Sequence, residues 1–287
     1  MIITLKNEKL TVKISTLGAE LISAVGTDGH EYIYTGSHWG GHAPLLFPVC
    51  GSLVDDRYTY HGKEYAMAKH GLARRRDFTL LSATDECAVL SFAASEETRK
   101  YYPFDFELIA EYSITGEVLA ASFTVRNHGE GDMPYMFGWH PAFVLGGEED
   151  IGGFYLDFGI DGPLTMHTLN GAFLSGEKLS FPLDLGTYRL NEQQIYENDT
   201  LILTGTRGAV RLYGEGDIHE VTLTYGEGLP YVCVWKWPDS AARYICIEPW
   251  SGVPSRGREP ENFDKREMSH LKGGESFTYE YTVEFSK

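Results

Sequence analysis

Glu248 is the residue whose place in the sequence best suits acid–base chemistry. It ends the apolar segment 244–248, YICIE, and precedes Pro249. A strand here puts Glu248 on the same face as Tyr244 and Cys246, and the proline favours an extended backbone at Glu248. If this carboxyl group is desolvated, its pKa rises, and it suits a general base or acid near neutral pH. A glutamate that simply meets solvent at a strand end leaves the same pattern, so both interpretations stay open.

His140 also precedes a proline, in the apolar segment 136–143, MFGWHPAF. Pro141 therefore favours an extended backbone at His140 and helps to aim its side chain. Burial among these apolar neighbours would lower the pKa of the imidazole, and a neutral ring can accept or donate a proton. The alternative is a core histidine that is hydrogen-bonded to a backbone carbonyl.

His70 is the second candidate histidine, and it lies beside the most basic stretch of the chain. Gly71 follows it and allows the backbone to turn, which leaves the imidazole uncrowded. Three arginines come next, Arg74, Arg75 and Arg76. They suit a polar or anionic ligand group, although such a triplet is more often a solvated face paired with acidic residues.

Two histidines and a glutamate are also the residue types of a metal site. The sequence has none of the short spacings HxH, HxxxH or HxxE around these residues. We therefore predict no metal and no cofactor. Asp199, before the apolar residues 201–203, suits hydrogen bonds to hydroxyl groups or an Asx turn. Trp235 and Trp250 are among five tryptophans whose flat faces suit either sugar stacking or core packing.

The elements that must position these residues are mostly strands. Residues 220–225, EVTLTY, alternate with a period of two, and residues 58–65, YTYHGKEY, predict a hairpin with a turn at His61-Gly62. Helix signals are confined to a short helix capped near Ser95 and a turn or two within 262–271. No GxGxxG or P-loop motif is present. We predict an all-β fold, a large antiparallel sandwich or barrel, as one domain over 1–287.

The overall composition excludes several classes of partner. The formal net charge of −17 disfavours nucleic acid and anionic membrane surfaces. Four cysteines occur without a CxxC pair, which fits a reduced, cytoplasmic setting rather than a disulfide framework. No apolar run approaches the ~20 residues that span a bilayer. Nothing in the sequence indicates an oligomeric state.

Several short motifs, taken in order, resemble the aldose 1-epimerase (galactose mutarotase-like) family, and in particular its LacX-like branch. Each motif is short, and their order and spacing carry the resemblance over most of the chain. They are residues 14–21 (ISTLGAEL), 44–48 (PLLFP), 70–74 (HGLAR), 102–106 (YPFDF), 140–143 (HPAF), 198–201 (NDTL) and 246–250 (CIEPW).

This resemblance implies a large antiparallel β-sandwich with few helices, and a reaction that interconverts the α and β anomers of an aldose. By motif, Glu248 is implied as the general base, His140 as the general acid, and His70 as a second histidine that binds the sugar. Asp199 is implied to bind ring hydroxyls. Where many family members carry an arginine after the FPxxG segment, this chain has Ser52. Arg74 then becomes the candidate replacement.

Three further functions remain as alternatives. The first is an epimerase acting on a hexose 6-phosphate, with Arg74, Arg75 and Arg76 binding the phosphate. The second is a non-catalytic sugar-binding or sensing protein that keeps the pocket. The third is a metal-dependent sugar isomerase. In the first two cases the partner is a small sugar, as it is for the aldose epimerase.

Overall fold

Strands dominate the computed structural model, which describes residues 1–147, 151–257 and 259–287. The long strands β9 (Phe106–Thr115) and β10 (Val118–Asn127) alternate buried residues with more accessible ones along almost their whole length. This is the period of two expected when one face of a sheet lies on a core. Nearly every strand pair is antiparallel, so the predicted all-β, antiparallel fold is confirmed.

The largest sheet has nine strands and includes the C-terminal strand of the chain near its middle. In spatial order it contains β17 (Thr187–Arg189), β14 (Phe154–Asp157), β19 (Ala209–Gly214), β20 (Glu220–Tyr225), β25 (Ser276–Ser286), β10, β9, β8 (Cys87–Ala93) and β7 (Thr79–Ala83). The predicted strand over residues 220–225 is β20.

A second sheet of eight strands carries the polar residues singled out above. It contains β16 (Phe173–Phe181), β15 (Leu164–Asn170), β18 (Leu201–Thr204), β21 (Tyr231–Trp235), β22 (Tyr244–Trp250), β12 (Gly138–Trp139) and β4 (Leu45–Leu46) in that order, with β13 (Ala142–Val144) also paired to β22. Smaller sheets are formed by β1 (Ile2–Lys6), β2 (Leu10–Ser15) and β3 (Glu20–Gly26), by β11 (Met133–Tyr135) and β24 (Ser269–Leu271), and by β23 (Glu261–Asn262), β5 (Arg57–Tyr60) and β6 (Lys63–Ala66).

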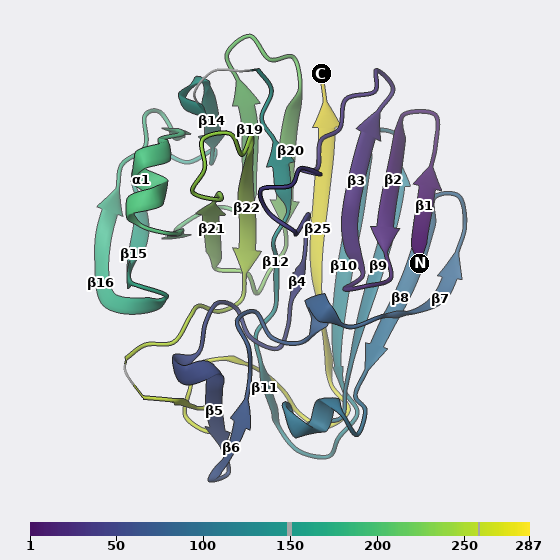
Figure 1. Ribbon diagram of the computed structural model, residues 1–287, viewed down its shortest axis with the longest axis vertical. Helices are drawn as coiled ribbons and strands as arrows, with labels where there is room; N and C mark the ends of the chain where they lie inside the picture. Colours follow the sequence, from purple (N-terminus) through teal and green to yellow (C-terminus); the bar gives the residue numbers. More distant parts are fainter. Residues whose placement is uncertain (148–150, 258) are drawn as a thin grey trace.

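The two large sheets pack face to face, and aromatic side chains fill the space between them. Figure 1 shows β21 and β22, together with β1–β3, in front of the strands of the nine-stranded sheet. Trp139 of β12 contacts Phe123 of β10 and Tyr281 of β25, with ring centroids 5.9 and 5.3 Å apart. Trp139 is therefore a core residue, and it holds the adjacent His140 close to this rigid interface.

Strand β22 lies in the middle of the eight-stranded sheet, and all of its residues are buried. Ile245 and Ile247 belong to the main core, whereas Cys246 packs in a separate cluster on the other face, as alternation requires. The sequence predicted that Glu248 ends this strand, and that boundary was wrong: β22 continues through Pro249 to Trp250. Cys233 of β21 is the cross-strand partner of Glu248. The carboxyl group thus emerges from the interior of a sheet.

The predicted hairpin turn is present, whereas the two segments predicted as helical differ from the prediction. The hairpin of β5 and β6 turns at His61 and Gly62, with φ of 48° and 74°, as predicted. Near Ser95 there is one 3₁₀ turn, Thr98–Lys100, shorter than the predicted helix. Of the turn or two predicted within 262–271, one tight turn is present, in which the Arg266 N–H donates to the Asn262 carbonyl at 2.9 Å. No helix follows it, because β24 pairs with β11 and buries Leu271.

The one α-helix among the described residues is α1 (Glu192–Glu197), which was not predicted from the sequence. Its signal was Asn191, whose side chain accepts a hydrogen bond from the Gln194 N–H. The remaining helical turns are 3₁₀: Val54–Asp56, Ala73–Arg75, Thr98–Lys100 and Ile151–Gly153. Among the described residues, no helix is both long and apolar enough to cross a membrane.

Two loops meet at Gly71 and hold the segment that carries His70. His70 has φ of 65° and Gly71 has φ of 75°, so two consecutive residues adopt the left-handed conformation. The Leu72 N–H donates to the Phe47 carbonyl at 2.7 Å. A Cβ at Gly71 would lie 2.2 Å from that same carbonyl oxygen. Only glycine fits here, for reasons of both conformation and space.

We therefore expect Gly71→Ala to be severe. The left-handed conformation alone costs a non-glycine residue about 1–3 kcal/mol, and the clash with backbone adds to this cost. Gly62→Ala is the matched control, because Gly62 has φ of 74° but a Cβ added there would meet no atom within 4 Å. Thermal unfolding should show a clearly larger decrease in Tm for Gly71→Ala than for Gly62→Ala. Equal decreases would mean that the two loops adjust freely.

Candidate active site

A cavity of about 180 Å³ opens on the face of the eight-stranded sheet that carries Glu248. This is small beside the ~300–1,000 Å³ typical of drug-sized ligand sites, and it suits a small molecule. All of the residues predicted for the site line this one cavity, although they come from distant parts of the sequence. They are Glu248, His140, His70, Arg74, Asp199, Ser52, Trp250 and Trp235.

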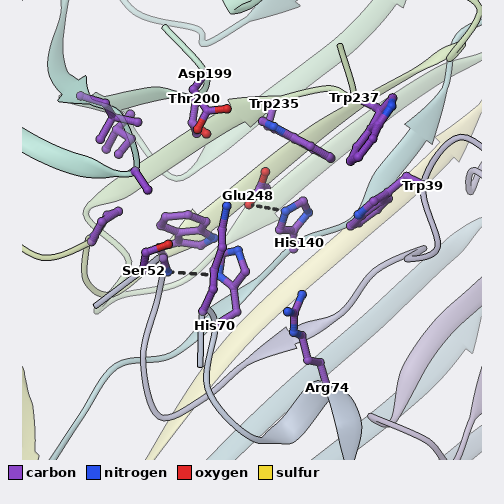
Figure 2. Close-up of a pocket in the computed structure, with 17 residues that line it drawn as sticks. Trp39, Ser52, His70, Arg74, His140, Asp199, Thr200, Trp235, Trp237 and Glu248 are labelled. Carbon is purple, nitrogen blue, oxygen red and sulfur yellow. Dashed lines mark hydrogen bonds and ion pairs between the residues drawn. The ribbon is translucent and has the colours of Figure 1, made fainter. Parts of the chain in front are cut away.

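Glu248 and His140 are in direct contact within this cavity. His140 Nε2 lies 3.2 Å from Glu248 Oε2, and the two side chains are 8% and 1% exposed. No described residue completes a well-aligned hydrogen bond to either oxygen of Glu248 or to His140 Nδ1. Buried polar atoms are nearly always hydrogen-bonded, so these atoms can form hydrogen bonds with polar groups that enter the cavity (Figure 2).

Burial shifts the pKa values of the two groups in opposite directions. Desolvation raises the pKa of Glu248 well above its usual value, opposed by the charge of Lys69 and by the nearby Trp250 indole. Desolvation lowers the pKa of His140 to about 3. Burial therefore favours a neutral pair, with a protonated Glu248 beside an uncharged His140. Because the two groups lie 3.2 Å apart, they act as one unit that carries one proton between them.

His70 presents a defined tautomer to the cavity. The Gly51 N–H donates to His70 Nδ1 at 3.1 Å, so the ring proton lies on Nε2. Burial, with the positive charge on neighbouring groups, holds the pKa of His70 well below its usual value. The ring stands edge-on to His140 and Trp250, with centroids 5.7 and 5.6 Å away. A neutral imidazole held in this way can donate a hydrogen bond to an oxygen atom of a ligand.

Aromatic rings fix His140 from two sides. Trp39 stacks on its ring at 4.9 Å between centroids, and Trp235 stands edge-on at 5.6 Å. The His140 N–H also donates to the Pro44 carbonyl at 3.1 Å. Trp39 and Trp237 line the cavity but were not predicted as site residues. Their only sequence signal was residue type, because nothing in the local pattern around Trp39 links it to His140.

Asp199 and Thr200 lie on the side of the cavity opposite His70, where α1 leads into β18 (Figure 2). Asp199 has φ of 58°, and its N–H donates to the Tyr196 carbonyl at the end of α1 at 3.3 Å. The side chain is exposed at the cavity rim. Both predicted roles of Asp199 are therefore compatible with the structure, because the residue lies in a turn and also faces the cavity.

The three consecutive arginines do not line the same cavity. Arg74 lines the cavity, and no described residue accepts a hydrogen bond from its buried Nε. Arg75 and Arg76 instead line a different hollow on the far side of the 66–76 segment, and Arg76 pairs with Glu97 at 2.8 Å. The suggestion that all three arginines bind one anionic group does not fit this geometry. Lys69, which was not predicted as a site residue, takes their place beside Arg74 in the cavity.

The side chains around Glu248 include one group that could hold a metal ion. The candidate ligand atoms of His140, Cys246 and Glu248 lie within 4.8 Å of one another, and His70 is outside this group. Burial raises the pKa of the Cys246 thiol well above its usual value, and only the thiolate is a good metal ligand. The donor set therefore favours proton transfer over metal binding, and the absence of a metal stays a prediction.

Comparison with known proteins agrees with this geometry. A family model described as aldose 1-epimerase matches residues 1–283. The plasmid-encoded LacX protein of Lactococcus lactis subsp. lactis is 30% identical over 281 residues, covering 88% of each chain. A galactose mutarotase related enzyme from Lactobacillus acidophilus superposes with a TM-score of 0.93 at 30% identity, covering 100% of this chain and 98% of that one. A galactose mutarotase-like protein from Lactobacillus casei gives 0.94 at 28% identity, covering 99% and 100%. The chain therefore belongs to the aldose 1-epimerase family.

Proposed function

We propose that this protein is an isomerase that interconverts the α and β anomers of an aldose by opening and closing the sugar ring. The observation that carries the proposal is the buried contact of His140 Nε2 with Glu248 Oε2 at 3.2 Å, at the cavity wall. Ring opening removes a proton from the anomeric hydroxyl and adds one to the ring oxygen. These two oxygens are bonded to the same carbon, so two adjacent proton-transfer groups can reach both of them.

The proton balance of the reaction matches a pair that holds one proton. In the ionised form, Glu248 takes the proton of the anomeric hydroxyl while the imidazolium of His140 protonates the ring oxygen. The bond between the anomeric carbon and the ring oxygen breaks, and an aldehyde forms. The pair is then neutral, which is the form that burial favours. Rotation about the bond to the aldehyde carbon and reversal of both transfers closes the ring on the other face.

The remaining cavity residues would bind and orient the sugar. His70 Nε2–H can donate to a sugar oxygen, and Asp199 can accept from ring hydroxyls on the opposite side. Trp235 and Trp250 offer apolar faces, and Ser52 adds a small polar group to the wall. Orientation of this kind matters because proton transfer requires groups within hydrogen-bond reach of the reacting atoms.

The wild-type protein tests this function directly. Saturation-transfer NMR should show faster exchange between the α and β anomers of glucose or galactose than in buffer alone, in proportion to enzyme concentration. A binding constant measured by titration separates the alternatives. Binding without any acceleration would favour the non-catalytic sensor, and the epimerase proposal would be abandoned.

A second candidate substrate is a sugar that carries an anionic group, such as a hexose 6-phosphate. The observation that favours it is a pair of cations in the cavity of an acidic protein. Lys69 and Arg74 both line the cavity, and neither forms an ion pair within 4.0 Å with a described residue. Unpaired arginine and lysine side chains beside a pocket suit phosphate or carboxylate.

For that substrate, replacing both Lys69 and Arg74 by methionine should lower kcat/KM for the 6-phosphate by about 10–100-fold. This range corresponds to the ~1.5–3 kcal/mol of a hydrogen bond to a charged group. Arg75→Met is the matched control and should have no effect, because Arg75 lies outside the cavity. Parallel assays with the neutral aldose decide between roles: an equal loss on both sugars would assign the two cations to hydroxyl groups shared by both.

A further inference from the structure

Lys236 is a buried lysine that does not line the cavity, although its two neighbours in the sequence, Trp235 and Trp237, both do. Its side chain is fully buried. Its ammonium group donates to Glu192 Oε1 at 2.7 Å, to the Tyr196 hydroxyl at 2.8 Å and to the Asp239 carbonyl at 2.8 Å. Few lysines are buried so completely, and this one is fully hydrogen-bonded.

On one side, this ammonium group is tied to the element that carries Asp199. Glu192 and Tyr196 lie one turn apart on α1, and the Tyr196 hydroxyl also donates to Glu192 at 2.7 Å. The backbone carbonyl of Tyr196 accepts the N–H of Asp199, which is held in the left-handed conformation at the cavity rim. The position of Asp199 and Thr200 therefore follows the position of α1.

On the other side, the ammonium group bonds to the loop that follows β21, residues 236–243, which carries Trp237. Its bond to the Asp239 carbonyl closes the loop after β21, and the Trp237 N–H donates to the Tyr244 hydroxyl at 3.1 Å. The Asp239 carboxylate lies 3.8 Å from His38, one residue before Trp39. In Figure 2, Asp199, Thr200, Trp235 and Trp237 lie on the opposite side of the cavity from Ser52 and His70.

We propose that Lys236 is a positioning residue, whose buried ammonium group holds α1 and the loop 236–243 together and so sets the geometry of the sugar-binding wall. This inference rests on the proposed function. It assigns Lys236 to substrate binding and not to proton transfer, because its ammonium group bonds to Glu192, Tyr196 and the Asp239 carbonyl and to neither member of the Glu248–His140 pair.

Stability alone does not explain a charge at this position. Transfer of an ammonium group from water into a protein is costly, and apolar replacements of similar volume often leave stability unchanged or higher. The ion pair adds directional hydrogen bonds. These bonds fix α1 relative to the loop 236–243, whereas apolar packing alone would allow the two elements to slide past each other. A wall that must match sugar hydroxyls needs this precision.

The test separates positioning from folding by comparing Lys236→Met with the double variant Lys236→Met/Glu192→Gln. The single variant leaves the Glu192 carboxylate without its cation and should lower Tm. The double variant removes both charges and should recover most of that loss. We expect KM for the aldose to rise about tenfold or more in both variants, with kcat within about threefold of wild type. Lys178→Met, at an exposed lysine on β16, is the control and should match wild type.

Sugar affinity measured by titration, without turnover, keeps this result distinct from a failure of the proposed function. If the wild type binds sugar but does not turn it over, weaker binding by both variants still supports the role of Lys236. The inference is overturned if the double variant is folded and binds sugar with wild-type affinity. It is equally overturned if both variants lose kcat and keep KM, because that result would place Lys236 in the proton-transfer step.

Discussion

Glu248→Gln is expected to slow anomer interconversion by about 10²–10⁴-fold while sugar binding persists. The amide has nearly the shape of the carboxyl group but cannot take a proton from the anomeric hydroxyl, and one positioned proton transfer contributes a factor of this size. Saturation-transfer NMR with the sugar anomers measures the rate, and titration measures the affinity. Full activity in this variant would show that Glu248 is not the base.

Glu248→Gln should also make the folded protein more stable than the wild type, by a margin that grows as the pH increases. Burial raises the pKa of Glu248 in the folded protein, so the protonated folded state is favoured below the unfolded pKa, and this stability is lost as pH rises through the folded pKa. Glutamine does not titrate and avoids the loss, which amounts to about 1.4 kcal/mol for each unit of the shift. Tm measured from pH 5 to 9 should therefore show an increasing advantage for Glu248→Gln. Glu284→Gln, at an exposed strand position, should show none.

His140→Gln is expected to cause a second loss of about 10²–10⁴-fold, because the variant cannot protonate the ring oxygen. The matched control is His167→Gln. His167 is also a buried histidine with one side-chain partner, Thr204, but it lies outside the cavity. The control should keep wild-type kcat/KM. If His140→Gln does so too, the ring oxygen receives its proton from another group.

The pH dependence of kcat/KM should distinguish the wild type from His140→Gln. The wild-type pair works while it holds one proton, so its activity should be level over a wide range. It should fall on the acid side only well below the usual pKa of histidine, when the pair takes up a second proton, and on the alkaline side when the last proton leaves. In His140→Gln, Glu248 acts alone and must be ionised. Residual activity should then increase with pH through the raised pKa of Glu248, and a level profile would contradict the shared proton.

Much of the fold could be predicted from local patterns. Alternation in residues 220–225 and the His61-Gly62 turn are short-range signals, and both appear as expected. The failures occurred where long-range pairing competes with local preference. Residues 262–271 resemble a short helix, yet Ser269–Leu271 form a strand because Met133–Tyr135 offers a partner. The capping signal at Asn191 was present in the sequence, but without a helical period after it α1 was overlooked.

For the site, too, some features could be predicted from local sequence and others could not. The residue types and the prolines after Glu248 and His140 pointed to proton transfer, and the order of the motifs pointed to the family. Local sequence could not distinguish Arg74 from Arg75, because adjacent residues of one 3₁₀ turn face different cavities. Nor could it show that Trp39 stacks on His140, or that Lys236 is buried. These relations depend on how separate loops meet over the sheet.

For Glu248, some properties follow from the sequence and others only from the tertiary structure. The sequence by itself determined the face of the strand on which Glu248 lies, because side chains alternate with a fixed period of two. It also determined a rigid, extended backbone at Glu248, through Pro249. Only the tertiary structure decided that this face is buried and that His140 lies 3.2 Å away. The pKa of a carboxyl group depends on the solvent and charges around it in space, and around Glu248 these include Lys69 and His140, which lie more than a hundred positions away in the chain.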